Sequence, residues 1–161
     1  MQGLQKALNR VENEIVGNPY ETAVGLTKRG EVLYVRKGDK TSTTFISGRK
    51  FLHTVTHNHP GNCSFSLNDI LAISTSNLPE LRVATKDHVY SAKITKKISL
   101  DKETVKELVL DVDFCVRLDF VPLINNGTMT MEEANKKHWH EVWTRFTKKV
   151  NWFAYKRTKR Q

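Results

Sequence analysis

The periodicity of the chain changes sharply at Pro60, and this change limits the possible folds more than any other feature. Residues 51–59 (FLHTVTHNH) have the composition of a β-strand, and Pro60 helps to end it because proline has no backbone N–H to donate. A short loop follows, and from Ser66 the apolar residues recur at helical spacing. A strand that leads directly into an amphipathic helix predicts a helix packed on a sheet, which is an α/β or α+β fold.

The remaining N-terminal two-thirds of the chain continues this alternation. Leu4, Leu8, Val11 and Ile15 lie on one stripe of a helix, which Gly17 ends. Two strands joined by a tight turn at 28–30 come next, and β-branched residues predict a third strand. Another hairpin is expected around Lys86 and Asp87. The expected strands are 21–26, 31–37, 41–46, 51–59, 80–85 and 88–95.

Two further helices are expected in the C-terminal third. Residues 101–118 form the first, with Leu108, Val112, Cys115 and Leu118 spaced for one face. The pattern Thr130-x-x-Glu133 is a capping box that opens the second. One side of that helix would carry its apolar residues, Met131, Ala134, Trp139, Val142, Trp143, Phe146 and Val150.

These elements predict one domain over residues 1–161. A central mixed sheet flanked by helices would form its core over about 20–95, preceded by an N-terminal helix at 1–17. An additional basic C-terminal helix is expected at 130–161. The content of 39% hydrophobic and 27% charged residues is typical of a folded domain and argues against a disordered chain.

Several function classes are disfavoured by composition. No apolar run approaches the roughly 20 residues that span a bilayer, and the N-terminus lacks the apolar region of a secretory signal. Cys63 and Cys115 do not form a Cys-x-x-Cys pair and cannot build a disulfide framework. We therefore expect a soluble cytoplasmic protein with no membrane partner.

The net charge of +9 is concentrated near the C-terminus. Residues 136–160 contain nine basic residues and one acidic residue. With Trp152, Phe153 and Tyr155 interleaved, this region is compatible with contact to nucleic acid or to an acidic partner. It is equally compatible with a solvated helix face. The candidate contact residues are Lys148, Lys149, Lys156, Arg157, Lys159 and Arg160.

The segment around Pro60 also carries the residues best suited to chemistry. His57 and His59 lie two positions apart on the expected strand, so both imidazoles point to one face. Ser66 stands at a helix N-cap, and Asp69 follows in the first turn, where the loop can bring it back to the histidines. A His-x-His pair alone is equally compatible with a surface pair. Two histidines, one aspartate and a position for water match an open catalytic zinc site.

The string His57-x-His59-Pro60 followed by Ser66-x-x-Asp69 resembles the signature of the JAMM/MPN+ metalloproteases. The residues of this motif are most similar to those of the bacterial branch of the family. That branch includes RadC-like proteins and the JAB-type domains of phage head-morphogenesis proteins and polymorphic toxins. The resemblance covers about residues 20–95. It implies a sheet between helices and zinc-dependent hydrolysis of peptide or isopeptide bonds, often next to ubiquitin-like modifiers.

Residue by residue, the resemblance implies that His57, His59 and Asp69 bind Zn²⁺ and that Ser66 hydrogen-bonds the developing oxyanion. The upstream glutamate of the family sits on the first core strand, which points to Glu21 as the general base. Glu31 is the alternative, although it follows a turn where a charged residue most simply faces water. The interval from His59 to Asp69 is one residue shorter than the most common family spacing.

Two functions from different classes follow. The first is a zinc metallopeptidase that cleaves an amide or isopeptide bond near the C-terminus of a small protein or modifier. Its setting would be a bacterial cytoplasm or a phage, where it could be part of the virion. The alternative is a RadC-like nucleic-acid-binding or nuclease-associated module that uses the basic C-terminal region. His53 is a candidate outer partner of the site, or a plain strand histidine.

Overall fold

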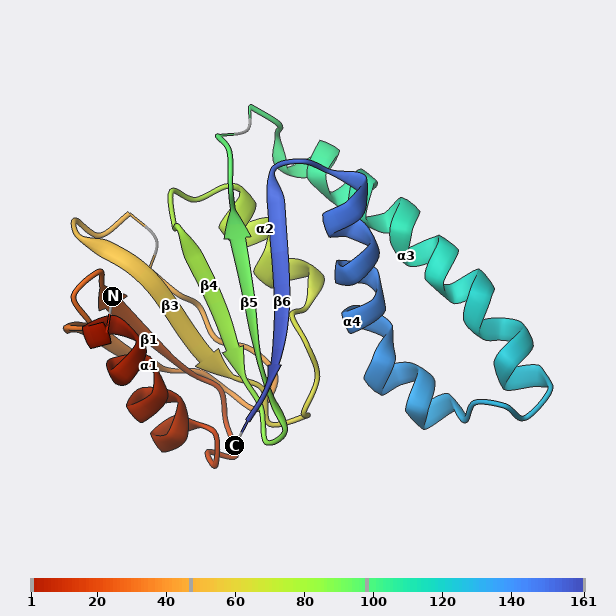
Figure 1. Ribbon diagram of the computed structural model, residues 1–161, viewed down its shortest axis with the longest axis horizontal. Helices are drawn as coiled ribbons and strands as arrows, with labels where there is room; N and C mark the ends of the chain where they lie inside the picture. The colour runs from red at the N-terminus through yellow and green to blue at the C-terminus, as the bar shows by residue number, and fades with distance from the viewer. Residues whose placement is uncertain (1, 47, 98, 161) are drawn as a thin grey trace.

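A computed structural model of the chain describes residues 2–46, 48–97 and 99–160. Where a predicted segment includes residue 1, 47, 98 or 161, that position lies outside the described residues. The fold is α+β, with a six-stranded mixed sheet and four helices among the described residues (Figure 1). The helices are α1 (Gln2–Ile15), α2 (Leu67–Ser74), α3 (Lys102–Asn125) and α4 (Met131–Lys149). The strands are β1 (Thr22–Thr27), β2 (Val32–Lys37), β3 (Leu52–Asn58), β4 (Glu80–Ala84), β5 (His88–Ile94) and β6 (Phe153–Lys159).

The strand order is β2-β1-β3-β4-β5-β6. Only β3 and β4 run parallel, because α2 crosses over between them, and every other neighbouring pair is antiparallel. This arrangement places β3 in the interior of the sheet, hydrogen-bonded to β1 on one side and β4 on the other. The carboxyl end of β3 is therefore held from both sides.

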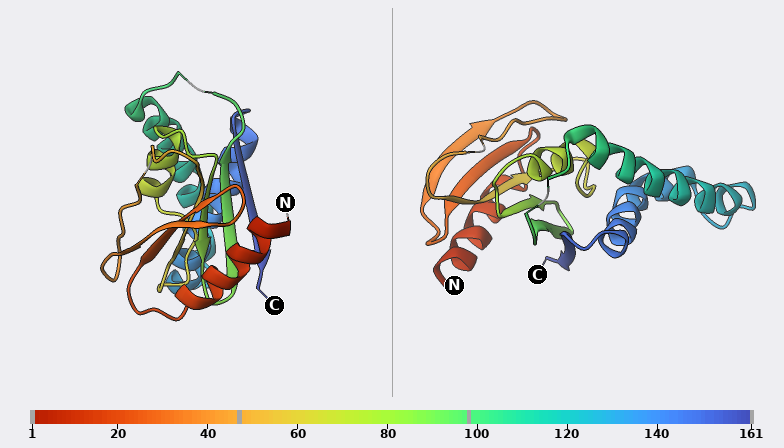
Figure 2. Two further views of the ribbon diagram at one scale, coloured as in Figure 1. Left: turned by 90° about the vertical axis from the view of Figure 1, so that its left-hand side faces the viewer. Right: turned by 90° about the horizontal axis from the view of Figure 1, so that it is seen from above.

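Helices cover the two faces of the sheet unequally. On one face, α1 packs on β1 and β3 through a small core that includes Leu8, Val11 and Leu26. On the other face, α2, α3 and α4 share the main core with the sheet, centred on Trp143 and Phe146. Figure 2 shows α1 and α2 on opposite sides of the sheet, with the α3–α4 hairpin extending beyond it.

The face of α3 that packs on the core differs from the expected one. Its buried apolar residues are Val105, Val109, Val112 and Val116, whereas Cys115 is exposed and Leu118 is 55% exposed. The helix carries apolar residues on two stripes, so both fit a helical period. Packing against α2 and α4 selects the valine stripe. Of the expected face, Val112 is buried and Leu108 packs against the core, whereas the placement of Cys115 and Leu118 was wrong.

The C-terminal region is a helix followed by a strand. The predicted capping box is confirmed, because Thr130 and Glu133 exchange hydrogen bonds at the start of α4. The helix ends at Lys149, and β6 then pairs with β5, so the single helix expected over 130–161 was wrong in its last part. Trp152 and Phe153 are buried in the main core, where their burial favours leaving the helix and joining the sheet edge.

The strand expected at 41–46 is also absent from this described segment, which is irregular. Asp39 accepts hydrogen bonds from the backbone N–H groups of Thr41 and Ser42, each at 2.8 Å, and this turn bends the chain. Both edges of β1 are already occupied by β2 and β3.

None of the described helices combines the length and apolar character needed to cross a bilayer.

Candidate metal centre

The two motif histidines lie at the carboxyl end of β3. His57 is fully buried and His59 is 8% exposed. The backbone N–H of His59 donates to the carbonyl of Ala84 at the end of β4, so the ladder continues past the last residue of β3. The imidazoles project from the interior of the sheet, where backbone pairing on both sides fixes their position.

Glu21 reaches the same place from the start of β1. Ala23 pairs with His57 in the sheet register, and the Thr22 N–H donates to the Asn58 side chain at 2.7 Å. Glu21 is consequently buried, with its Oε1 3.8 Å from His59 Nε2. Glu31 is exposed and contacts the hydroxyl of Thr27 instead. Of the two candidate bases, Glu21 is the one beside the histidines.

The loop after Pro60 returns Asp69 to the histidines, as the sequence predicts. Its Oδ1 lies 3.3 Å from His57 Nε2 and its Oδ2 lies 3.6 Å from His59 Nε2. Ser66 is the N-cap of α2, and both its backbone N–H and its hydroxyl donate to Asp69 Oδ2 at 2.7 Å. Ser66 therefore orients Asp69 in this structure, and its contact with an oxyanion stays a prediction.

The nitrogen atoms are arranged as metal ligands would be. His59 Nδ1 lies 3.2 Å from the Cys63 carbonyl and 3.1 Å from the Ser64 carbonyl, which only a protonated Nδ1 can serve. The unprotonated Nε2 of His59 then faces His57 Nε2 at 3.0 Å. Two nitrogens about 2 Å from a common zinc ion are separated by about 3 Å. Ligand atoms of Glu21, His57 and His59 all lie within 4.8 Å of one another.

Burial and charge set the protonation of this group. Burial, with a smaller effect of His57, lowers the pKa of His59 to about 4, so its imidazole is neutral at pH 7. Burial raises the pKa of Glu21 to about 7. Burial opposes ionisation of Asp69, but the interactions with His57, His59 and Ser66 together outweigh it and hold the pKa of Asp69 below its usual value. A neutral imidazole at His59 beside an ionised Asp69 offers suitable donors for a divalent metal ion.

Other histidines stay outside the site. His53 hydrogen-bonds Thr54 at the far end of β3. His138 pairs with Asp113 on α3, and His140 Nδ1 lies 2.9 Å from the Tyr155 hydroxyl. His138 and His140 therefore contact different partners, and neither belongs to the group of Glu21, His57 and His59.

The sequence did not single out Cys63 and Ser64 as part of the site. Cys63 Sγ lies 3.7 Å from His59 Nδ1, and burial raises the pKa of the Cys63 thiol. The carbonyls of both residues face His59 Nδ1. Their contribution comes from backbone atoms, for which the residue type carries no signal.

The six candidate contact residues of the basic region are divided among different surfaces. Lys148 and Lys149 lie on α4, where Lys149 pairs with Asp111 at 3.2 Å. Lys156 and Arg157 alternate on β6 and so point to opposite faces of the sheet. Lys159 and Arg160 lie at its end. The basic residues therefore do not form one helix face.

Comparisons of the chain with protein-family models, with curated proteins and with solved structures found no match. The residues of the site define a buried group of Glu21, His57 and His59 that could bind a metal ion, with Asp69 in contact with both histidines.

Proposed function

We propose that this protein is a zinc metallopeptidase of the JAMM/MPN+ type. The single observation that carries the proposal is the convergence of His57, His59 and Asp69 with Glu21 beside them. These residues come from β3, the start of α2 and the start of β1, so the motif string and the upstream glutamate meet although up to 48 positions separate them.

The donor set fits zinc. His57, His59 and Asp69 would hold the ion, because two imidazole nitrogens and one carboxylate are the ligands of open catalytic zinc sites. When bound, zinc polarises a carbonyl and lowers the pKa of a water ligand towards neutrality. The side chain of Ser66 supports this set from outside, since its hydroxyl donates to Asp69 Oδ2.

Glu21 is the proposed general base. Its Oε1 lies 3.8 Å from His59 Nε2, so the carboxylate lies beside the histidines. A carboxylate with a pKa near 7 can accept a proton from the attacking water and release it to the leaving amine nitrogen. Hydrolysis of an amide or isopeptide bond needs both transfers.

The proposed substrate is a peptide or protein with a scissile amide near its C-terminus, as in ubiquitin-like modifiers. The residues of the motif support a bacterial or phage origin for the enzyme, which would act in the cytoplasm or as part of a virion. Ser66 is proposed to turn its hydroxyl proton from Asp69 Oδ2 to the oxyanion, while its backbone N–H keeps its bond to Asp69. In other enzymes such a donor contributes on the order of 3 kcal/mol.

Metal content tests the proposal first. Protein purified without chelator should contain one zinc ion per chain, measured by inductively coupled plasma mass spectrometry. His57→Ala and Asp69→Ala should each lose it. His138→Ala is the matched control, because His138 is a partly buried histidine paired with an aspartate outside the site. The metal site is refuted if wild-type protein that has been incubated with added zinc still contains no zinc.

Activity tests the reaction separately. A fluorogenic amide at the C-terminus of a ubiquitin-like protein should be hydrolysed by the zinc-loaded protein. Glu21→Gln should keep the zinc and lose at least about 100-fold in rate, because the amide cannot accept the proton. Glu31→Gln should keep both. Equal activity of Glu21→Gln and wild type would remove Glu21 from the mechanism.

A further inference from the structure

Among the described residues, no helix packs on the part of one sheet face formed by β4, β5 and β6. Helix α1 covers β1 and β3, and the part of this face formed by β4, β5 and β6 lies beside it. The residues there are mostly polar or charged, including Arg82, Ser91, Lys93 and Lys156. Because an apolar layer is missing, this surface is suited to water and charged ligands rather than to a further core helix.

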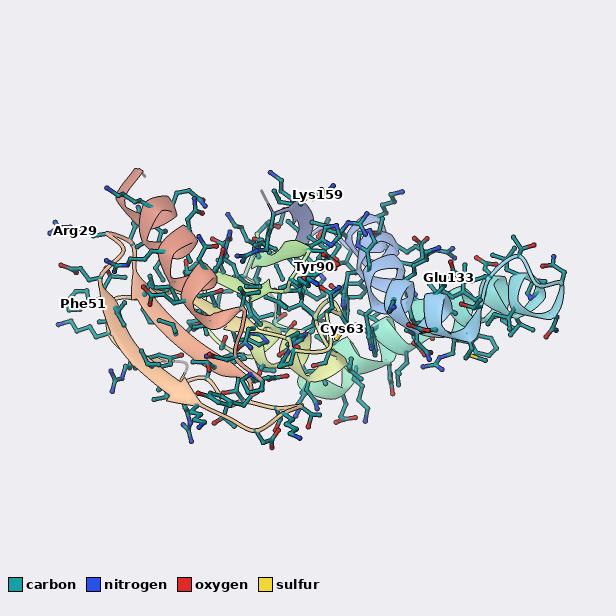
Figure 3. The ribbon with its side chains drawn as sticks, turned by 90° about the horizontal axis from the view of Figure 1, so that it is seen from below. Arg29, Phe51, Cys63, Tyr90, Glu133 and Lys159 are labelled. Carbon is teal, nitrogen blue, oxygen red and sulfur yellow. The ribbon has the colours of Figure 1, made fainter. Side chains whose placement is uncertain are left out.

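The uncovered face is the floor of a groove with a volume of about 1250 Å³. Its sides are α1 and the end of β6, and the turn between β1 and β2 contributes Lys28 and Arg29. Figure 3 shows Lys159 extending from β6 on the same side of the sheet as α1. The sides meet at one end, where Arg160 Nη2 contacts Asn13 Oδ1, so the groove is narrow there.

The groove carries a large excess of positive charge. Its two acidic residues are both neutralised, since Glu12 pairs with Arg82 at 2.7 Å and Glu80 pairs with Arg82 and Lys93. Five other cations line it, and none takes part in an ion pair within the described part of the chain. They are Lys28, Arg29, Lys156, Lys159 and Arg160.

Two of these cations belong to residues that lie at opposite ends of α1. The Arg29 carbonyl lies close to Gly3 at the start of the helix, and Arg160 contacts Asn13 near its end. Ten helical steps of 1.5 Å separate these points by about 15 Å. A ligand that matches them must carry negative charge at intervals over that distance, as a nucleic-acid strand does on every nucleotide.

We propose that this groove binds a single nucleic-acid strand through its phosphates. Surfaces that bind proteins are depleted in lysine and have aromatic or apolar anchors, whereas nucleic-acid surfaces are polar and strongly positive. The groove has lysines on both sides, and its described lining residues include no Trp, Tyr or Phe and one imidazole, that of His53. Because the proposed contacts are to phosphates, which carry no sequence information, recognition is sequence-independent. The site lies on the sheet face opposite the main core and does not use the metal ligands.

Fluorescence anisotropy with a labelled 20-nucleotide single strand of mixed sequence tests this inference. Five phosphate contacts predict a logarithmic salt slope of about −3.5, which is about a 100-fold loss of affinity between 50 and 200 mM salt. Lys28→Ala combined with Lys159→Ala should reduce the slope to about −2 and weaken binding at least about tenfold at 50 mM salt.

Lys102→Ala combined with Lys137→Ala is the matched control, because both lysines are exposed, on α3 and α4, and the double variant removes the same net charge. It should bind within about twofold of wild type, and all variants should keep the wild-type thermal transition. Binding should also survive chelator treatment, which separates this result from the proposed peptidase activity. The inference is overturned if the two double variants weaken binding equally, if wild type does not bind at 50 mM salt, or if polyglutamate of equal charge displaces the strand.

Discussion

The hydroxyls of Ser64 and Tyr155 lie 2.9 Å apart, although 91 positions separate the two residues in the sequence. The carbonyl of Ser64 faces His59 Nδ1, and the Tyr155 hydroxyl also contacts His140 Nδ1 on α4. Nearby, Trp143 Nε1 donates to the Phe65 carbonyl at 2.9 Å. The C-terminal helix and strand therefore hold the loop that orients a candidate metal ligand.

Removing the Tyr155 hydroxyl should loosen this loop. Tyr155→Phe keeps the ring and its packing, so we expect zinc affinity to fall about tenfold, at the lower end of the effects of outer contacts on metal ligands. Competition with a chromophoric chelator measures the affinity. Tyr34→Phe is the control, because its hydroxyl is also hydrogen-bonded but contacts Ile46 instead. Equal affinities for the two variants would show that Tyr155 does not position His59.

Ser66 and Thr130 provide a matched pair of helix caps. Each is an N-cap with a reciprocal capping box, at the starts of α2 and α4 respectively. Ser66→Ala and Thr130→Ala should each lower the free energy of unfolding by about 1 kcal/mol, measured with urea. Only Ser66→Ala should also weaken zinc binding, since it removes a donor to Asp69. If zinc binding is weaker in both variants, the loss of affinity comes from general destabilisation and not from the missing donor to Asp69.

The raised pKa of Glu21 predicts a pH-dependent stability in the presence of chelator. Folding raises this pKa from 4.5 to about 7, so the folded state favours the protonated form. The stability that protonation contributes is present below pH 4.5 and is lost as the pH rises to 7. Glu21→Gln should therefore gain up to about 3 kcal/mol relative to wild type between pH 4.5 and 8. Urea unfolding at several pH values measures the difference, and a constant difference would contradict the prediction.

Glu12 holds together the polar layer under α1. It is 2% exposed, and its carboxylate accepts hydrogen bonds from Arg82 Nε, Arg82 Nη2 and the Thr56 hydroxyl. Glu12→Ala leaves the Arg82 guanidinium underpaired and should reduce the free energy of unfolding by about 3 kcal/mol.

The double variant tests whether this loss arises from the charge left behind. Glu12→Leu combined with Arg82→Leu removes both charges and should be less destabilised than Glu12→Ala, because no buried charge lacks a partner. Thermal and urea unfolding of the variants give the comparison. A double variant less stable than Glu12→Ala would show that the ion pair itself contributes most of the stability.

Much of the local structure could be predicted from the sequence. The helical stripe from Leu4 to Ile15, the strand before Pro60, and the caps at Ser66 and Thr130 are all confirmed. These features depend on the periodicity of apolar side chains or on hydrogen bonds between residues at most four positions apart. Both can be predicted from residues that are close in the sequence. The convergence of His57, His59 and Asp69 was predictable for the same reason, since one strand, one loop and one helix cap bring them together.

Tertiary structure decided the features that depend on distant partners. Both stripes of α3 are helical in period, and only contact with α2 and α4 selects Val105 to Val116 for the core. Residues 153–159 become β6 because β5 offers an unpaired edge, and Asp39 bends the chain where β-branched residues favoured a strand. Sheet register places Glu21, rather than Glu31, beside His59. The sequence alone determined the types of the candidate ligands and their local spacing. Packing and strand pairing determined which charged groups and hydroxyls contact those ligands, because these contacts join residues that are far apart in the chain.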